Sequence, residues 1–297
     1  MELDELRKKI DVVDVKLLEL LDKRASLVKQ VGRLKSKTGR DFYVPHREKK
    51  IITGLLERYK GHLPPEAVES IFREIVHSCR SLETRLKVAY FGPEATFTHQ
   101  AALKNFGSAV DYIPVKLISD VFTEVEKNRA DYGVVPIENS TEGIVNHTLD
   151  MFMESDLVIC AEISLPIEHC LLALSEDIKD IKKIYSHYQP LGQCRNWIEE
   201  NLPGIPIEET SSTSEAARKA SKEKGTAAIA SKAAAVLYNL EVVVRGIEDS
   251  RENYTRFLAV GRNNPQRSGQ DKTSIMVSLK DKVGALHELW FPLRNTR

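Results

Sequence analysis

The most informative stretch of the chain is Val134-Val135-Pro136-Ile137-Glu138-Asn139-Ser140-Thr141-Glu142-Gly143-Ile144-Val145-Asn146. It begins as a short β-branched run that stops at a proline, then becomes a polar turn with Gly143 just beyond, and an amphipathic run follows from Ile144 to Met153. This order predicts a strand, a turn and a helix start, the layout in which α/β proteins place ligand groups at the carboxyl ends of strands. Free backbone N–H groups at such a helix start suit an anion. The alternative is an ordinary turn in which Ser140 or Thr141 caps the helix.

Composition limits the class of protein. The chain has 297 residues, of which 42% are hydrophobic and 29% charged, so we expect a globular protein of two or three domains. The 43 basic and 43 acidic residues balance, which gives no indication of a nucleic-acid partner. No apolar run approaches the roughly 20 residues that span a bilayer, and the charged N-terminal segment lacks the apolar core of a signal peptide. We therefore expect no membrane association.

The cysteines indicate a redox environment. Cys79, Cys160, Cys170 and Cys194 form no Cys-x-x-Cys motif and have no histidine at ligand spacing. We expect reduced thiols in a cytoplasmic protein, with neither a metal site nor a cofactor.

The first 84 residues have a helical pattern. Apolar residues from Leu6 to Leu34 recur at spacings of three, four and seven, which predicts one helix of about 35 residues, roughly 50 Å long. Such a helix is too long to be buried within its own domain, so we expect it to pair with a partner chain. Two more helices are predicted, from about Pro45 to Lys60 and from Glu66 to about Arg85.

Several charges in this domain lie where apolar residues are expected. Arg24 and Lys35 share a helical face with Val28 and Val31. Either the two cations snorkel at a helix edge, or they help to form a pocket for a dianion together with Arg7 and the Arg47-Glu48 pair.

Residues 2–84 resemble the all-helical chorismate mutase family. The similarity lies in Leu6-Arg7-Lys8-Lys9-Ile10, Asp14, Leu17-Leu18-Glu19-Leu20-Leu21, Arg24, Val31-Gly32, Lys35 and Pro45-His46-Arg47-Glu48. That family forms an intertwined dimer in which the long helix of one chain completes the site of the other. The resemblance implies a homodimer through the N-terminal helices, with Arg7 of one subunit and Arg24 of the other holding the carboxylates of chorismate.

The same resemblance implies roles for six more residues. Arg47 supports the site, Lys35 lies at the ether oxygen of the breaking bond, and Glu48 takes the ring hydroxyl. Cys79 stands where a small polar residue often occurs, and two positions depart from the family pattern. Val44 replaces a possible aspartate and would contribute only its backbone, whereas Glu83 replaces a glutamine and would have to be protonated to donate a hydrogen bond. The rearrangement of chorismate to prephenate needs no nucleophile, so cations and hydrogen-bond donors suffice.

Residues 86–262 alternate short β-branched strands with helical runs, which predicts βαβ units. Five polar turns are predicted at strand ends, and together they favour one shared cleft although each alone is as easily a helix cap. They are Thr96-Phe97-Thr98, Glu138-Asn139-Ser140, Ser186-His187-Tyr188-Gln189, Thr210-Ser211-Ser212-Thr213 and Asn253-Tyr254-Thr255-Arg256-Phe257.

This region resembles the prephenate dehydratase family over about 170 residues, through Gly92-Pro93, Thr96-Phe97, Val135-Pro136-Ile137-Glu138-Asn139-Ser140, Ser186-His187-x-Gln189, Ala228-Ile229-Ala230-Ser231 and Thr255-Arg256-Phe257. Tyr188 departs from the usual proline. The implied fold is two α/β lobes, like a periplasmic binding protein, with the site between them. Thr255 is the implied essential residue, as a donor or relay to the leaving oxygen. Arg256 either anchors a carboxylate or forms a structural ion pair. The other implied substrate-binding residues are Thr96, Asn139, Ser140, His187, Gln189 and Phe257.

The last segment begins with a linker at residues 263–270. A strand is predicted from Thr273 to Leu279 and an amphipathic stretch from Gly284-Ala285-Leu286-His287. This pattern resembles the first strand and helix of an ACT domain, a phenylalanine-sensing α+β module, so residues 271–297 are expected to form an incomplete ACT domain.

The sequence therefore predicts a multidomain protein: an all-α chorismate mutase domain (1–85), a two-lobed α/β prephenate dehydratase domain (86–262) and the ACT remnant. The expected function is bifunctional, converting chorismate to prephenate and prephenate to phenylpyruvate in phenylalanine biosynthesis. The alternatives are a non-catalytic ligand-binding or regulatory protein on the same folds, or an enzyme with only one active half.

Overall fold

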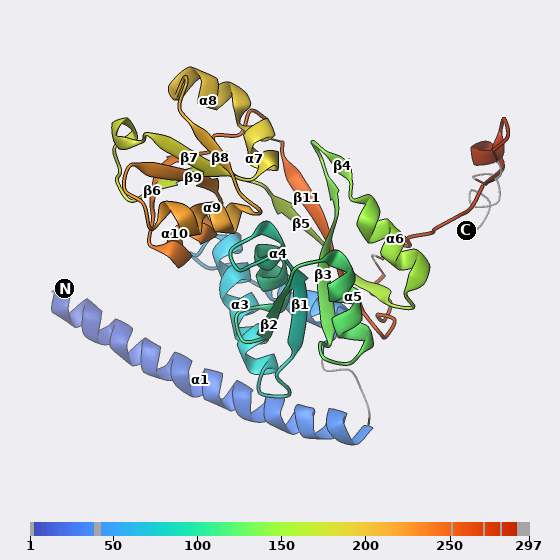
Figure 1. Cartoon of the computed structure of the whole chain (residues 1–297). Helices are drawn as coiled ribbons and strands as arrows, with labels where there is room; N and C mark the ends of the chain where they lie inside the picture. Colours follow the sequence, from blue (N-terminus) through green and yellow to red (C-terminus); the bar gives the residue numbers. More distant parts are fainter. Residues whose placement is uncertain (1–2, 39–42, 251, 270, 280, 290–297) are drawn as a thin grey trace. The chain divides into compact units, whose positions relative to one another are not determined.

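The computed structural model describes residues 3–38, 43–250, 252–269, 271–279 and 281–289 (Figure 1). The chain divides into two compact units, Met1–Pro265 and Gln266–Arg297. The first unit contains the long helix, two further N-terminal helices and two β-sheets.

The N-terminal region is helical, as predicted. Its helices are α1 (Leu3–Thr38), α2 (Pro45–Leu56) and α3 (Pro65–Arg80). A proline opens both α2 and α3, where its missing N–H removes no hydrogen bond. The predicted ends at Lys60 and Arg85 were too late. After Arg80 the chain tightens into a turn, in which Glu83 N donates to Arg80 O at 2.8 Å, and this bond replaces the next helical one.

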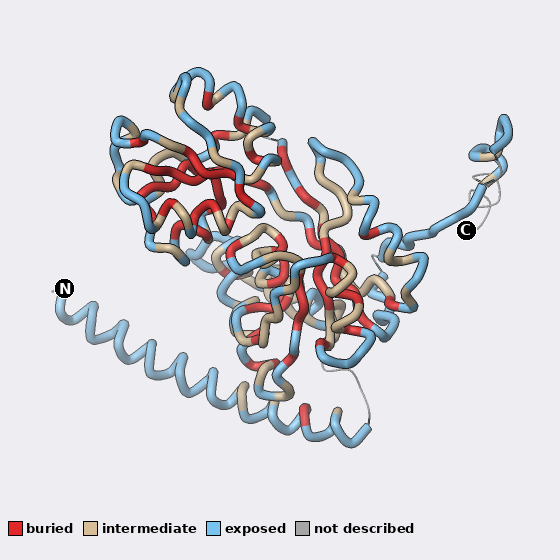
Figure 2. Tube along the Cα trace, in the orientation of Figure 1, coloured by how far each residue is buried: buried red, intermediate tan, exposed pale blue. Residues whose placement is uncertain are grey.

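Helix α1 is exposed along nearly its whole length. Figure 2 shows it almost entirely pale blue, and among its described residues only Gly32 is buried. Its apolar side chains face solvent in this single chain, and Leu17 and Leu20 are 52% and 64% exposed. Helix α1 meets α3 only through its C-terminal half, where Arg24 and Lys35 make hydrogen bonds. Most of its apolar stripe is therefore left uncovered within one chain.

The first sheet has six strands. They are β1 (Lys87–Phe91), β2 (Asp111–Val115), β3 (Tyr132–Asn139), β4 (Gly143–Ile144), β5 (Val158–Pro166) and β11 (Tyr254–Gly261). Their order is β2-β1-β3-β11-β5, with β4 paired to β3. β1 is parallel to β2 and β3, whereas β11 is antiparallel to both of its neighbours.

Successive residues of β1 enter opposite cores, as the period-two geometry of a strand requires. Val88 and Tyr90 pack with Phe106 of α4 (Phe97–Phe106), whereas Ala89 packs with Phe122 of α5 (Ile118–Glu126). Helix α6 (Asn146–Glu154) follows β4 and adds Met151 and Phe152 to the second cluster.

The second sheet has five strands, in the order β10-β6-β9-β7-β8. They are β6 (Cys170–Ala173), β7 (Lys183–Ser186), β8 (Ile207–Glu209), β9 (Thr226–Ala230) and β10 (Glu241–Arg245). The accompanying helices are η1 (Ile178–Asp180), α7 (Tyr188–Gln193), α8 (Arg195–Asn201), α9 (Thr213–Ala220) and α10 (Lys232–Tyr238). Alanines of α9 and α10 pack directly on alanines of β9, so small side chains let helices and sheet approach closely.

The chain passes between the two sheets twice. Residues 167–169 lead from β5 to β6, and the segment after β10 returns to β11. The two crossing segments are hydrogen-bonded to each other: Ile167 N donates to Asn253 O at 2.9 Å, and Ile247 N donates to His169 O at 3.1 Å. They run side by side and are not independent loops.

The stretch from Val134 to Asn146 differs from its prediction. The strand does not stop at the proline but continues through Pro136 to Asn139 and turns back as β4. The register against β11 shifts next to Pro136, at the irregularity between Arg256 and Phe257. Such an irregularity accommodates a residue that has no N–H to donate. The N-cap of α6 is Val145, so the alternative of an ordinary turn in which Ser140 or Thr141 caps the helix is wrong.

Two further predictions are corrected. The polar turn expected at Asn253–Phe257 is mostly strand, because β11 begins at Tyr254 and lies between β3 and β5. In the second unit, the strand expected from Thr273 to Leu279 is irregular, and Ile275 is 57% exposed. A strand pattern without a neighbouring strand has no ladder to join. Residues 285–289 form a helical turn, as the amphipathic pattern predicted.

Candidate active sites

The first candidate site lies where the C-terminal end of α1 meets the end of α3. Lys35 Nζ donates to Glu83 Oε2 at 2.7 Å, and both side chains are largely buried. Gly32 permits this approach, because a Cβ atom there would lie 2.9 Å from Glu83 Cα. About three turns earlier on α1, Arg24 Nη1 donates to Ile75 O at 3.4 Å. The structure therefore brings Lys35 and Glu83 together and holds Arg24 against the same helix.

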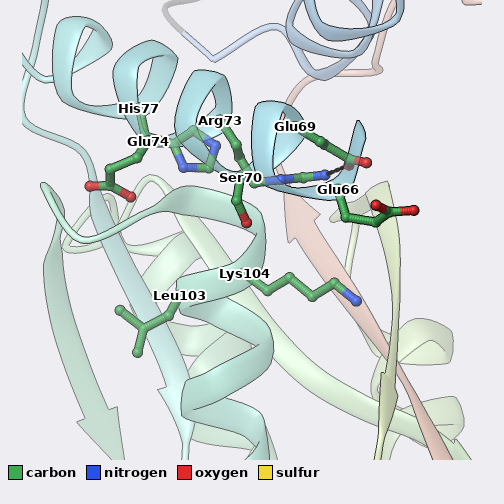
Figure 3. Close-up of a pocket in the computed structure, with 8 residues that line it drawn as sticks. All are labelled: Glu66, Glu69, Ser70, Arg73, Glu74, His77, Leu103 and Lys104. Atoms are coloured by element: carbon green, nitrogen blue, oxygen red, sulfur yellow. Dashed lines mark hydrogen bonds and ion pairs between the residues drawn. The ribbon is translucent and has the colours of Figure 1, made fainter. Parts of the chain in front are cut away.

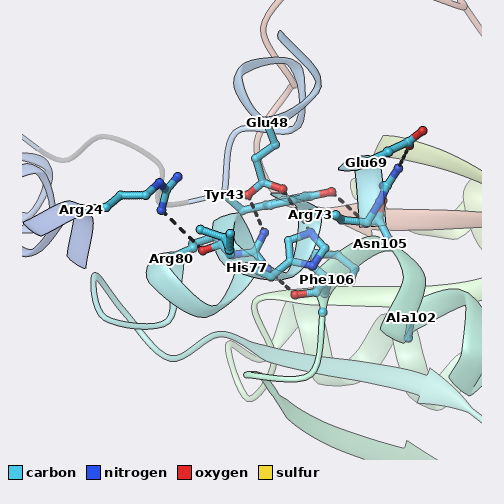
Figure 4. A network of polar contacts seen from close by, with 12 residues as sticks. Arg24, Tyr43, Glu48, Glu69, Arg73, His77, Arg80, Ala102, Asn105 and Phe106 are labelled. Atoms are coloured by element: carbon cyan, nitrogen blue, oxygen red, sulfur yellow. Dashed lines mark hydrogen bonds and ion pairs between the residues drawn. The ribbon is translucent and has the colours of Figure 1, made fainter. Parts of the chain in front are cut away.

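Glu48 lies in a polar network formed by α2, α3 and the C-terminal end of α4 (Figure 4). Arg80 Nη1 donates to Glu48 Oε1 at 2.7 Å, and His77 Nε2 lies 3.5 Å from Oε2. Arg80 also donates to the backbone oxygen of Phe106, and its guanidinium lies over the ring of Tyr43. Burial alone would raise the pKa of Glu48, but the hydrogen bond from His77 and the charge of Arg80 outweigh it and lower that pKa.

The other predicted mutase residues have varied settings. Arg7 is exposed near the start of α1 and pairs with Asp4 at 3.4 Å. Val44 caps α2, and its backbone oxygen already accepts from Arg47 N and Glu48 N. The side chain of Arg47 is exposed, whereas Cys79 is buried.

The second candidate site is centred on a side-chain pair between β3 and β11. Asn139 and Thr255 face each other in the register, and Asn139 Nδ2 donates to Thr255 Oγ1 at 2.8 Å. The amide oxygen of Asn139 accepts from the backbone N–H groups of Thr141 and Glu142 at 2.9 and 3.0 Å. This fixes the orientation of the amide. Thr255 therefore accepts from Asn139, which leaves its hydroxyl hydrogen free to donate to a substrate.

Residues associated with the second sheet extend this pair. Asn253 Oδ1 accepts from Asn139 Nδ2 at 3.2 Å, and Asn253 Nδ2 donates to Gln193 Oε1 at 2.8 Å. Gln193 and Gln189, both on α7, donate to the carboxylate of Glu142 in the β3–β4 turn. Side chains of both sheets thus meet around Asn253 and Glu142.

The remaining predicted dehydratase residues have different settings, and of Ser140, Thr96, His187 and Phe257 only Ser140 has a hydrogen bond to Asn253, a member of this network. Ser140 Oγ accepts from Tyr254 N at 3.0 Å, and Thr96 caps α4 by accepting from His99 N. His187 precedes α7, and burial lowers its pKa. Phe257 is 2% exposed and lies in the core cluster with Tyr90, so its side chain packs inside the sheet.

Arg256 points away from Thr255, as the alternation of a strand requires. It forms ion pairs with Glu138 on β3 and with Glu162 on β5, the latter at 3.0 Å. The hydrogen bond that Arg256 donates to Glu162 raises the pKa of Arg256, and the hydrogen bond to Glu138 adds to this effect. Of the two roles left open for Arg256, these contacts favour the structural ion pair.

A separate cavity of about 420 Å³ lies between α3 and α4 (Figure 3). Its lining residues are Glu66, Glu69, Ser70, Arg73, Glu74, His77, Leu103 and Lys104. An ion pair joins Arg73 to Glu69, and Glu74 accepts from Ser108 at 2.6 Å. The lining contains none of the predicted site residues, so this open hollow is a feature of the contact between α3 and α4.

Sequence reasoning missed several members of both networks. Gln193 follows Gln189 by four residues on α7, and Asn253 precedes Thr255 by two positions at the start of a strand, so periodicity offered a signal for both. His77 and Arg80 share a helical face by their spacing of three. For His169, whose Nε2 lies 2.8 Å from Gln193 Oε1, the segment Ile167–Leu172 offered no signal.

Within the residues that the structure describes, no group of three or more histidine, cysteine or acidic side chains could hold a metal ion. Cys79, Cys170 and Cys194 are buried free thiols. None of the described helices combines the length and apolar character required to cross a bilayer.

The two candidate sites correspond to two known enzyme domains. Residues 6–84 match the family model of chorismate mutase type II, and residues 88–265 match that of prephenate dehydratase. A prephenate dehydratase from Arthrobacter aurescens, solved with L-Phe, is similar in structure with a TM-score of 0.64 and 34% identity, covering 69% of this chain and 71% of that one. The chain is thus a two-domain member of the chorismate mutase and prephenate dehydratase enzymes.

Relatives with both domains in one chain define the family further. The bifunctional chorismate mutase/prephenate dehydratase of Aquifex aeolicus is 49% identical over 291 residues, covering 97% of this chain and 80% of the relative. That of Pseudomonas aeruginosa is 47% identical over 301 residues, covering 99% and 82%. The chain belongs to the family of bifunctional chorismate mutase/prephenate dehydratases of phenylalanine biosynthesis, which confirms the predicted family.

Proposed function

We propose that the chain converts chorismate to prephenate at the site around Lys35 and Glu83, and prephenate to phenylpyruvate at the site around Asn139 and Thr255. Family membership supports the two activities. The observation that carries the assignment of the second site is the Asn139–Thr255 hydrogen bond, because Thr255 accepts in it and can still donate its hydroxyl hydrogen to a substrate.

The first reaction needs charge and position. Its substrate is a dianion whose ether oxygen gains negative charge as the bond breaks, so cations held in place supply most of what catalysis requires. Arg24 and Lys35 provide such cations, eleven residues or about 17 Å apart along α1. Arg7 lies seventeen residues before Arg24, about 25 Å away along the same helix, so it would have to serve the site of a second copy.

A homodimer through α1 follows from that distance and from the exposed apolar stripe. A long helix with leucines more than half exposed is marginal alone and is stabilised by packing against a second apolar surface. The contact would bring Arg7 of the partner toward Arg24 and Lys35.

The second reaction removes carbon dioxide and water from prephenate together. The electron pair of the bond to the departing carboxylate moves into the ring and expels the hydroxyl, which takes up a proton and leaves as water. Thr255 can hydrogen-bond that leaving oxygen, because its own oxygen accepts from Asn139 and its hydroxyl hydrogen can donate. A threonine hydroxyl is a weak acid, so its role is that of a donor or relay and not of the final proton source.

The presence of two separate sheets supports the two predicted lobes of this half. Contacts between Glu142 on the β3–β4 turn and Gln193 on α7, and between Asn253 and Asn139, support a site between them. The assignment of residues 271–297 to an incomplete ACT domain stays a prediction from the sequence.

The test is the conversion of chorismate by the purified chain. We expect prephenate to appear first and phenylpyruvate to follow, with no added metal or cofactor. Failure to consume chorismate would refute the mutase assignment, and failure to convert supplied prephenate would refute the dehydratase assignment.

A further inference from the structure

A continuous chain of amide side chains leads away from Thr255. Asn139 donates to both Thr255 and Asn253, Asn253 donates to Gln193, and Gln193 donates to the carboxylate of Glu142 at 3.2 Å. An ionised carboxylate only accepts hydrogen bonds, so the NH₂ group of Gln193 must face Glu142. The amide oxygen of Gln193 must then face the other way, toward Asn253.

The same oxygen of Gln193 contacts His169. His169 Nε2 lies 2.8 Å from Gln193 Oε1, and because that oxygen can only accept, the proton of the imidazole must be on Nε2. Gln193 Oε1 thus accepts from Asn253 and from His169 together, and it cannot rotate without losing both bonds.

His169 lies where the chain passes from one sheet to the other. It is 1% exposed, its backbone N donates to Glu248 Oε2 at 2.8 Å, and its backbone O accepts from Ile247 N. Its ring meets the ring of Phe97 edge to face, with centroids 5.5 Å apart. Backbone hydrogen bonds and packing therefore fix the ring of His169 on the crossing segments. The ring in turn holds Gln193, the amide farthest along the chain from Thr255.

We propose that His169 is a positioning residue of the dehydratase reaction: as its Nε2–H tautomer it orients Gln193, and through Asn253 it orients the Asn139–Thr255 pair. This inference rests on the proposed role of Thr255. Loss of the Nε2 donor would allow Gln193 to turn, so that Asn253 and then Asn139 would lose their fixed orientation.

The alternative is a histidine that only fills space in the core. Burial lowers the pKa of His169, so the ring is held neutral and one nitrogen must be unprotonated. Nδ1 is that nitrogen, and among the residues that the structure describes no donor lies within hydrogen-bond distance of it. A ring that served only for packing would gain nothing from this arrangement, since an unpaired buried nitrogen is destabilising.

Two substitutions separate the roles of the two ring nitrogens. In His169→Gln the side-chain amide nitrogen is as many bonds from Cβ as Nε2 is, so the donor to Gln193 is kept. In His169→Asn the amide reaches only the position of Nδ1, and the donor to Gln193 is lost. His147, which is exposed on α6, provides the control variant His147→Asn.

The measurement is steady-state conversion of prephenate by the full-length chain. We expect His169→Asn to lower kcat by about 10- to 100-fold with KM changed less than about threefold, which is the scale of a misplaced catalytic group. His169→Gln should recover kcat to within about fivefold of the wild type, and His147→Asn should match the wild type. Equal kcat for the Gln and Asn variants, at any level, would overturn the proposal.

A double variant tests whether the effect travels through Gln193. If it does, His169→Asn should cause little further loss once Gln193→Leu has removed the acceptor, whereas independent effects would multiply. Multiplied losses would refute the proposal. Histidine ¹⁵N spectra should show His169 as the neutral Nε2–H form at pH 7, and the Nδ1–H form would also refute it.

The same experiments distinguish failure of the inference from failure of the proposed function. If Thr255→Ala retained full dehydratase activity, the assigned site would be wrong whatever His169 did. If Thr255→Ala were inactive while His169→Asn kept the wild-type kcat, only the role of His169 would be wrong.

Discussion

Lys35 and Glu83 form an ion pair, with Nζ 2.7 Å from Oε2, that joins the last turns of α1 to the turn after α3. The resemblance to chorismate mutases implies that Lys35 lies at the ether oxygen of chorismate and that Glu83 replaces a glutamine, a hydrogen-bond donor. Because Lys35 already donates a hydrogen bond to Glu83, a bound substrate must share the ammonium group of Lys35 with this carboxylate. An ionised Glu83 has no proton to donate and repels the charge that develops on the oxygen.

Glu83→Gln should therefore increase mutase turnover. A glutamine keeps a donor at every pH and releases Lys35 from the ion pair, so we expect kcat at pH 7 to 8 to rise on the order of tenfold. Mutase kcat of the two proteins at pH 7 to 8 provides the measurement, with dehydratase activity as the control. An unchanged or lower mutase kcat in the variant would show that the carboxylate of Glu83 does not compete with the substrate for Lys35.

Each reaction should be lost separately. Thr255→Ala should lower phenylpyruvate formation by at least about 100-fold and leave prephenate formation unchanged, because the hydroxyl lies in the other domain. Lys35→Ala should do the reverse. Thr255→Ser, which keeps the hydroxyl, is the matched control and should retain much of the dehydratase activity. Loss of both reactions in a folded single variant would contradict two independent sites.

The Arg80–Glu48 network should make stability depend on pH in one direction. The pKa of Glu48 is lower in the folded chain, so its stabilising effect is present above the unfolded pKa of about 4.3 and is lost as pH falls through the folded value. At pH 6, Glu48→Gln should lower the free energy of unfolding by about 1–3 kcal/mol. The difference from the wild type should shrink below pH 4.

Urea denaturation at several pH values would measure this difference. Glu57→Gln, at the exposed position just after α2, controls for the loss of one carboxylate. A Glu48→Gln difference that grew toward low pH would have the wrong sign for a stabilised carboxylate.

The exposed stripe of α1 predicts a dimer in solution. Leu17→Glu combined with Leu20→Glu should give a monomer in light scattering, since two charges would then lie in the apolar contact. Mutase activity should fall with dimer loss, because Arg7 would no longer reach a partner site, and dehydratase activity should persist. Leu63→Glu changes an equally exposed leucine outside α1 and should leave the oligomeric state unchanged. A wild-type chain that is monomeric at micromolar concentration would contradict the prediction.

Replacing Arg256 should show whether its side chain forms a structural ion pair or anchors the substrate. Because its guanidinium already pairs with Glu138 and Glu162 and is about one-third exposed, Arg256→Gln should lower the free energy of unfolding by about 1 kcal/mol. The KM for prephenate should change by less than about twofold. Arg129→Gln breaks the comparable pair with Glu124 and serves as the control. A tenfold increase in KM with unchanged stability would identify Arg256 as a carboxylate anchor instead.

Periodicity made some elements predictable and left others hidden. Helix α1 could be predicted from apolar residues spaced three and four apart, because a long helix repeats this spacing many times. β11 was missed since its first residues, Tyr254 to Arg256, are polar, and only the pairing with β3 and β5 makes them a central strand. The sequence pattern predicts a strand end at Pro136. The irregularity that accommodates this proline lies in β11, which is far away in sequence.

The same distinction applies to the candidate sites. Lys35, Asn139 and Thr255 lie in family motifs and Glu83 at a position that departs from one, and the structure joins the four in two pairs. Arg80, Asn253 and His169 have partners 24 to 114 residues away along the chain, and local spacing, where it gave a signal at all, did not identify those partners. A sequence shows which residue types are present, whereas hydrogen-bond direction depends on which atoms the fold brings face to face.

The two crossing segments also have a mechanical consequence. β5 and β11 are adjacent antiparallel strands, and the entire five-stranded sheet is inserted in the chain between them. A pulling force applied at residues 87 and 261 would act on the six-stranded sheet first. The inserted sheet would bear no load until the hydrogen bonds between β5 and β11 had sheared, and the hydrogen-bonded chain from Thr255 to His169 would break with them.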